Sequence, residues 1–166
     1  FYLISKCKFF ISTGTGLDAV ACMFRKPVLI VNYPTFGLVT ITPNIKLFIP
    51  KLFWSISKKR MLTFKEIFKM EAHLFRNDVD FKIKNIKVID NDIEDMKQTI
   101  SEMKKRMDGT WIETIEDIKL QKFFKSLWPD DPVTFGKIDP NFKIKLNKKI
   151  PLIGAHFLKK NKSLLN

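Results

Sequence analysis

The chain has 166 residues, of which 45% are hydrophobic, with only 6 Gly and 8 Pro. This composition excludes a generally disordered chain, and the length is sufficient for a single hydrophobic core. No apolar run approaches the ~20 residues that a transmembrane helix needs. The two cysteines are too few for a disulfide framework, so we expect a cytoplasmic protein in a reducing compartment.

The net charge of +13 comes mainly from lysine. Arginine, whose planar guanidinium group suits bidentate phosphate contacts, is scarce. The arginines are Arg25, Arg60, Arg76 and Arg106. We therefore expect phosphorylated ligands or an anionic membrane surface as partners rather than nucleic acid. A basic module that binds membranes or nucleic acid remains an alternative.

The chain begins with a pattern typical of a β–α–β unit. Residues 8–12 form an apolar run, as in a strand that is covered on both faces. Residues 17–24 predict a helix that ends before Pro27, and residues 28–31 predict a second buried strand. Such a short crossover implies parallel strands in an open α/β sheet. Since the first strand begins within about ten residues of the start and there is no initiator Met, we expect the chain to be the C-terminal part of a larger protein.

The junction between the first strand and the helix is rich in small and hydroxyl residues: Ser12, Thr13, Gly14, Thr15 and Gly16. A helix N-terminus offers unpaired N–H groups and a partial positive charge, and glycines allow a ligand to approach closely. This pattern indicates a diphosphate site, but a simple tight turn with a helix cap is the alternative. No Gly-Lys-Ser/Thr follows, which excludes a P-loop, and the third glycine of a dinucleotide fingerprint is missing.

The middle of the chain is harder to assign. Residues 33–61 contain three prolines, and we expect an irregular segment there. Within it, residues 46–60 interleave lysine with aromatic residues, a pattern typical of either a solvated edge or a membrane interface. Thr63 and Glu66 form a capping box that predicts the start of a helix, and residues 86–89 predict a short strand.

The clearest amphipathic helix is expected over residues 92–107, with Asn91 as its cap and Gly109 at its end. Its apolar residues are spaced by three and four, which predicts a face turned to the core. These residues are Ile93, Met96, Ile100, Met103 and Met107.

The C-terminal third is expected to add further helices. Thr114 and Asp117 predict the start of a helix that ends at Pro129. Residues 130–149 resemble a polar linker or arm, and residues 153–165 predict a last, basic helix. We therefore divide the chain into a domain of residues 1–129 and a C-terminal arm and helix of residues 130–166.

The remaining candidates for chemistry carry weak signals. His73 and His156 have no Cys or acid at ligand spacing, so no metal site is predicted. Glu113, Glu116 and Asp117 could serve as acid–base carboxylates, but acids in a first helical turn are stabilised by the helix dipole. We expect a structural role for them, and the catalytic residues stay unassigned.

Several blocks of the sequence resemble one family. "KCKFFISTGTGLDAVACMFRKPVLIVN" is similar to the donor-binding β–α–β unit of GT-B-type glycosyltransferases and of their sugar-nucleotide epimerase relatives. "NIKLFIPKLFWSISKKRMLTFKEIF", "EMKKRMDGTWIETIEDIKLQKFF" and "IGAHFLKKNKSLL" together resemble a family of bacterial surface-polysaccharide glycosyltransferases. The blocks occur in the expected order and cover most of the chain.

This resemblance implies a Rossmann-like open parallel sheet, the C-terminal half of a GT-B fold, with additional C-terminal helices. In such enzymes this half binds the nucleotide-sugar, a separate N-terminal domain mostly binds the acceptor, and no metal or other cofactor is essential. By match to the family pattern, residues 13–16 would contact the diphosphate, while Ser12 ends the strand. The glutamate that often binds ribose is replaced by Val20, so Asp18 would take that role or ribose would be bound elsewhere.

Three residues after the second strand would lie at the same crevice. Asn32, Tyr33 and Thr35 are expected either to contact the donor's sugar or base, or to be plain turn residues. The expected function is transfer of a sugar from a nucleotide-diphosphate donor to a saccharide or lipid-linked acceptor in surface-polysaccharide biosynthesis. The enzyme would lie in the cytoplasm, either free or peripherally at the inner face of the cell membrane. A sugar-nucleotide epimerase is the alternative enzyme.

Overall fold

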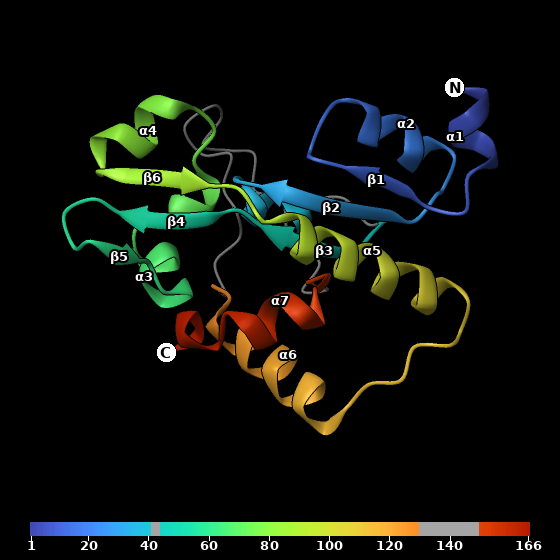
Figure 1. Cartoon of the computed structure of the whole chain (residues 1–166). Helices are drawn as coiled ribbons and strands as arrows, with labels where there is room; N and C mark the ends of the chain where they lie inside the picture. Colours follow the sequence, from blue (N-terminus) through green and yellow to red (C-terminus); the bar gives the residue numbers. More distant parts are fainter. Residues whose placement is uncertain (41–43, 130–149) are drawn as a thin grey trace.

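The computed structural model in Figure 1 describes residues 1–40, 44–129 and 150–166 of the chain. These residues form a Rossmann-like α/β fold around a four-stranded parallel sheet of order β1-β2-β3-β7. Its strands are β1 (Phe10–Ser12), β2 (Val28–Tyr33), β3 (Ile45–Pro50) and β7 (Leu152–Ile153). A smaller antiparallel sheet of order β5-β4-β6 contains β4 (Leu52–Ser55), β5 (Arg60–Met61) and β6 (Ile86–Ile89).

Helices lie on both sides of the parallel sheet (Figure 1). One side carries α1 (Tyr2–Lys6) and α2 (Leu17–Met23), and the other carries α5 (Ile93–Met107), α6 (Ile115–Leu127) and α7 (Ala155–Lys160). The smaller sheet is flanked by α3 (Phe64–Lys69) and α4 (Asp78–Ile83). Three short 3-10 helices complete the described elements: η1 (Phe36–Thr40), η2 (Ala72–Leu74) and η3 (Lys162–Leu165).

The predicted β–α–β unit is confirmed. β1 pairs in parallel with β2, with Phe10 opposite Val28 and Ser12 opposite Ile30. The α2 helix packs on these strands through Ala21, which is completely buried. A small side chain at this position lets the helix approach the sheet closely. The turn between β1 and α2 lies at the carboxyl edge of the sheet, because it directly follows the last residue of β1.

The prediction of an irregular segment over residues 33–61 is wrong. This segment contains η1, the central strand β3 and the first two strands of the smaller sheet. Leu47, Phe48 and Ile49 are completely buried, because β3 is covered on both faces and needs no polar alternation. Proline does not interrupt β3, since Pro50 is its last residue.

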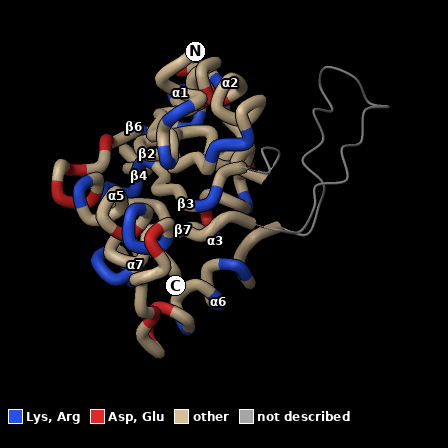
Figure 2. The backbone as a smooth tube through the Cα atoms, turned by 90° about the vertical axis from the view of Figure 1, so that its right-hand side faces the viewer, with Lys and Arg blue, Asp and Glu red and all other residues tan. Residues whose placement is uncertain are grey.

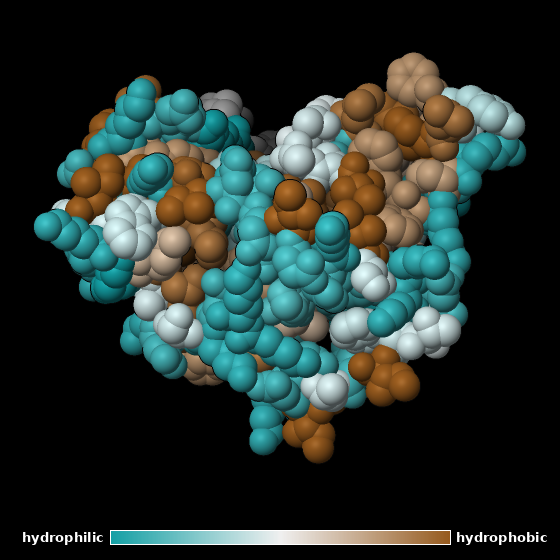
Figure 3. All heavy atoms as spheres, in the orientation of Figure 1, coloured by the Kyte–Doolittle hydropathy of each residue, from teal (hydrophilic) through white to brown (hydrophobic). Residues whose placement is uncertain are grey.

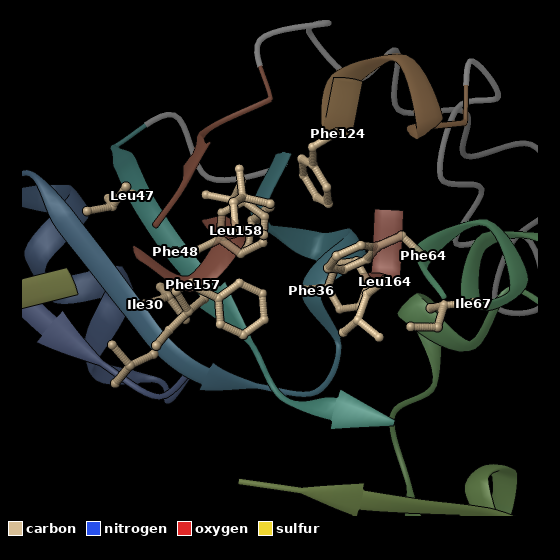
Figure 4. Packing of buried hydrophobic residues seen from close by; sticks show 14 of the residues in the cluster. Ile30, Phe36, Leu47, Phe48, Phe64, Ile67, Phe124, Phe157, Leu158 and Leu164 are labelled. Atoms are coloured by element: carbon tan, nitrogen blue, oxygen red, sulfur yellow. The ribbon is translucent and has the colours of Figure 1, made fainter. Parts of the chain in front are cut away.

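Aromatic residues fill much of the core beside the parallel sheet. Figure 4 shows side chains from elements that are distant in the sequence packed together there. Phe36 is completely buried, and its ring centroid lies 6.5 Å from that of Phe48 and 6.1 Å from that of Phe64. Phe124 of α6 lies 4.9 Å from Phe64 in an edge-to-face arrangement. The first helices, the sheet and the C-terminal helices therefore share one hydrophobic core.

The C-terminal segment does not form the single helix predicted over residues 153–165. It contributes β7 to the sheet, then turns at Gly154 into α7 and η3. The N–H of Gly154 donates to the Phe48 carbonyl at 3.0 Å, and a Cβ at Gly154 would lie 2.8 Å from Cγ2 of Ile49. The side chain of Gln121 hydrogen-bonds to both the N–H and the carbonyl of Ile153. These contacts hold residues 152–153 extended as a strand beside β3. The helix therefore begins only at Ala155, later than the sequence predicts. The predicted arm of residues 130–149 lies outside the described residues.

Two of the three predicted helix caps are correct. Thr63 with Glu66, and Thr114 with Asp117, form the expected capping boxes of α3 and α6. The α5 helix is capped by Asp92, whose side chain accepts from the N–H of Asp95, and not by Asn91.

The predicted apolar face of α5 is correct in part. Met103 is completely buried, whereas Ile93 is 67% exposed because it lies in the first turn, beyond the edge of the core. Gly109 follows the end of the helix with a positive φ of 71°, as the sequence indicates.

Candidate functional site

The candidate site is the turn of residues 13–16, which joins β1 to α2 and is exposed throughout. The buried Ser12 accepts hydrogen bonds at its Oγ from the N–H groups of Gly14, at 3.1 Å, and Thr15, at 3.4 Å. Within the described part of the chain, the N–H groups of Gly16 and Leu17 have no acceptor. The Ser12 hydroxyl group therefore holds the first half of the turn, while the first amides of the helix are left without a protein acceptor.

The two glycines of the turn have different roles. Gly14 has a positive φ of 85°, and a Cβ placed there would lie 2.2 Å from Cε2 of Tyr33. The Tyr33 ring thus lies directly against the backbone of Gly14, which only glycine allows. Gly16 has an ordinary helical φ of −57°, and a Cβ there would meet nothing within 4 Å.

A pair of alanine variants separates these roles. Gly14→Ala should lower the free energy of unfolding by about 2 kcal/mol, because it adds backbone strain and displaces Tyr33. Gly16→Ala should change it by less than about 1 kcal/mol, since the space is open and only the cap preference changes. Urea denaturation of both variants measures the difference, and equal losses would contradict the packing of Tyr33 on Gly14.

Asp18 lies in the first turn of α2 and is half-buried beside the turn. Burial raises the pKa of its carboxyl group, and hydrogen bonding to Ser12 offsets only part of this shift. Its Oδ1 atom is buried and has no hydrogen-bond partner among the described residues. The charge of Asp18 also contributes, after burial, to the raised pKa of the Cys22 thiol one turn later in α2.

Asn32, at the end of β2, is part of a reciprocal pair with Asn91. The N–H of Asn32 donates to Oδ1 of Asn91 at 3.2 Å, and the N–H of Asn91 donates to Oδ1 of Asn32 at 2.7 Å. Asn91 also donates from Nδ2 to the carbonyl of Pro50 at 2.9 Å. The carboxyl ends of β2 and β3 are thereby tied to the start of α5. The Asn32 carboxamide is used in this pair, so contact with a ligand stays a prediction.

Tyr33 and Thr35 connect the site to a second loop. Thr35 is buried and donates from Oγ1 to the carbonyl of Phe75 at 2.7 Å, which brings the neighbouring Arg76 to the same edge of the sheet. Burial and the charge of Asp18 raise the pKa of Tyr33, and the positive charge of Arg76 opposes them. The Tyr33 side chain therefore lies within reach of both charges.

The structure thus brings together the turn, Asp18 and Tyr33, whereas Asn32 and Thr35 position their neighbours. Sequence reasoning missed Arg76 and the structural role of Asn91. No local pattern marks either residue, because Arg76 lies 43 positions after Tyr33 and Asn91 lies 59 positions after Asn32.

The other titratable candidates make structural contacts. His73 is buried against aromatic rings, and its pKa is lowered to about 4 by burial. Glu113 forms an ion pair with Arg106 at 3.0 Å, and the buried Asp117 pairs with Lys159 at 2.8 Å. In residues 1–40, 44–129 and 150–166, no group of three or more His, Cys, Asp or Glu side chains is placed to hold a metal ion.

No protein-family model matches the chain, and neither a curated protein nor a solved structure matches it.

Proposed function

We propose that this chain binds the diphosphate group of a nucleotide-sugar at residues 13–16 and forms the donor-binding half of a GT-B-type glycosyltransferase. The observation that carries the proposal is the exposed turn at the carboxyl edge of two parallel strands, where the N–H groups of Gly16 and Leu17 have no acceptor among the described residues. In open α/β sheets, ligands bind at this edge. The ordered sequence blocks of the glycosyltransferase family supply the reaction type.

The proposed reaction transfers a sugar to a saccharide or lipid-linked acceptor in surface-polysaccharide biosynthesis. The bond between the anomeric carbon and the diphosphate oxygen breaks, and the nucleoside diphosphate leaves with the electron pair. The acceptor hydroxyl oxygen bonds to the anomeric carbon and gives its proton to a base, which we expect in a separate N-terminal domain. The task of residues 13–16 is to stabilise the negative charge that develops on the leaving diphosphate.

The residues around the turn fit different parts of such a donor. The Tyr33 ring covers one side of Gly14 and offers an aromatic surface at the edge of the crevice. Arg76 adds a positive charge near Tyr33 that suits a diphosphate, while Asp18 is the acid nearest to the turn for a ribose hydroxyl.

Two isosteric variants test the diphosphate site. Gly16→Asp places a carboxylate in open space at the turn, and Gly16→Asn places a neutral group of the same shape there. Both residues are good helix caps, so the fold should be preserved in each variant. We expect Gly16→Asp to weaken nucleoside diphosphate binding at least about tenfold more than Gly16→Asn, because a negative charge within ~5 Å of the diphosphate repels it.

Isothermal titration calorimetry on the full-length protein measures this difference with uridine, guanosine, adenosine, cytidine and thymidine diphosphates. If the unaltered protein binds none of them, or if the two variants bind equally, the proposal fails. A labelled sugar-nucleotide then distinguishes transfer from epimerisation. A sugar altered without any acceptor would indicate an epimerase instead.

A further inference from the structure

The C-terminal segment, residues 150–166, meets α5 and α6 along a polar seam, where Figure 3 shows hydrophilic side chains in the middle of the molecule. In the described part of the chain no helix is long and apolar enough to cross a membrane, and the helices at this seam carry charged faces. Figure 2 shows Lys and Arg residues of α7 close to Asp and Glu residues of the neighbouring helices. Among the described residues, the acids of the ion pairs across the seam belong to α5, its cap or α6, and the basic side chains to the C-terminal segment. These pairs are His156–Asp95, Lys159–Asp117, Lys160–Asp92, Lys160–Asp95 and Lys162–Glu116.

Asp95, in the first turn of α5, is a deeply buried acid of this seam and is only 1% exposed. Its Oδ2 atom accepts a hydrogen bond from Nζ of Lys160 at 2.9 Å. Among the described residues its Oδ1 atom has no hydrogen-bond donor, since Nε2 of His156 lies 3.7 Å away. Lys160 also pairs with Asp92, whose side chain caps α5 by accepting from the N–H of Asp95. One lysine of the C-terminal segment therefore holds both the cap and the first turn of α5.

Loss of the Lys160 charge would leave the buried carboxylate of Asp95 without a partner for its negative charge. Such a group costs so much free energy in the interior that the chain rearranges until water reaches it. The rearrangement would begin in the first turn of α5, and Asn91 directly precedes the cap of that helix. Asn91 is tied to Asn32 by the reciprocal hydrogen bonds, and Tyr33 follows Asn32 at the end of β2. A contact of the C-terminal segment thus reaches the crevice edge through a continuous series of bonded groups.

We propose that Lys160 is a positioning residue for the candidate crevice and acts on it through the first turn of α5. The C-terminal segment thereby fixes Asn91 and, with it, the end of β2 beside the candidate turn. This inference rests on the proposed function only for its effect on ligand binding. Lys162 provides a matched comparison, because it belongs to the same segment and its ion pair is with Glu116 at the start of α6, far from β2 in Figure 1. The two lysine side chains are similarly exposed, at 42% and 54%.

Amide hydrogen exchange of the full-length protein, followed by mass spectrometry, measures the positioning directly. The peptides to follow contain the N–H groups of Asn32 and Asn91, which are hydrogen-bonded in the reciprocal pair. In Lys160→Ala we expect both groups to exchange at least about tenfold faster than in the unaltered protein. In Lys160→Arg the guanidinium group restores the positive charge, so exchange should stay within about threefold of the unaltered protein. The same result is expected for Lys162→Ala, because its ion pair does not hold α5.

Leu62 in the smaller sheet provides an internal reference for overall stability. Its N–H donates to the carbonyl of Phe53 at 2.8 Å, and the residue is only 2% exposed. A local rearrangement leaves exchange at this amide unchanged, whereas a general loss of stability accelerates all three amides alike. Acceleration at Leu62 as large as at Asn32 and Asn91, or no acceleration at these two, overturns the proposal.

Calorimetry with the nucleoside diphosphates separates this inference from the proposed function. For a nucleotide that the unaltered protein binds, the Kd should rise at least about threefold in Lys160→Ala and stay unchanged in Lys160→Arg and Lys162→Ala. Faster exchange with an unchanged Kd would overturn the role of Lys160 in the site. Faster exchange in a protein that binds no nucleotide would reject the diphosphate site, but it would support the positioning of the crevice edge by Lys160.

Discussion

Asn91→Ala should lower the free energy of unfolding by about 3 kcal/mol, a large effect for one polar residue. Asn91 is only 5% exposed, and replacing it removes the hydrogen bonds that its side chain makes to the N–H of Asn32 and to the carbonyl of Pro50. A buried polar group that loses its partner costs about 1–3 kcal/mol, and this substitution affects two such groups.

Urea denaturation measures the loss, and Asn77→Ala provides the comparison. Asn77 caps α4 by accepting one hydrogen bond from the N–H of Asp80 at an exposed position. Its replacement should cost about 1 kcal/mol. If Asn91→Ala costs no more than Asn77→Ala, the Asn32–Asn91 pair does not stabilise the crevice edge. A large loss would mean that the Asn32–Asn91 pair, and not only the turn, holds the crevice edge in place.

Mild acid should destabilise the protein by about 2 kcal/mol between pH 7 and pH 5 through His73. The imidazole ring lies 5.0 Å from Phe68 and 6.0 Å from Phe36, measured between ring centroids. Burial lowers its pKa from 6.5 to about 4, and the interaction with the Ile67 backbone opposes this shift only in part.

The direction of this change in stability with pH follows from proton binding at His73. Between pH 6.5 and about 4 the unfolded chain binds a proton at His73 while the folded protein does not. The stability is therefore complete above the pKa of the unfolded state and decreases as the pH falls. His73→Leu removes the titrating group and should flatten this part of the stability curve, even if the variant is less stable at pH 7. Unfolding by urea at pH 7, 6 and 5 tests both proteins, and an unchanged slope in His73→Leu would exclude His73 as the cause.

Both predictions concern contacts that join distant parts of the chain, and this is where sequence reasoning reached its limit. The reciprocal pair depends on two asparagines that are 59 residues apart. The burial of His73 depends on Phe36, Phe68 and Trp128, which come from three different elements. Side-chain type alone predicted neither partner.

The candidate site likewise has one part that local sequence predicted and another that depends on contacts between distant residues. The composition of residues 12–16 was sufficient to indicate a turn between a strand and a helix, because glycine and hydroxyl residues have strong local preferences. The position of Tyr33 over Gly14 and the approach of Arg76 come from the pairing of β2 and the Thr35–Phe75 hydrogen bond.

The sequence by itself determined the β–α–β unit, the two capping boxes and the long α5 helix, since each depends on residues within a few positions of one another. Only the tertiary structure decided that β3 is a central strand, that residues 152–153 join it, and that Phe48 and Phe53 belong to the core. A two-residue strand such as β7 has no pattern of its own. It forms because the edge of β3 that is not paired with β2 supplies backbone hydrogen-bond partners, although the two strands are about 100 positions apart in the sequence.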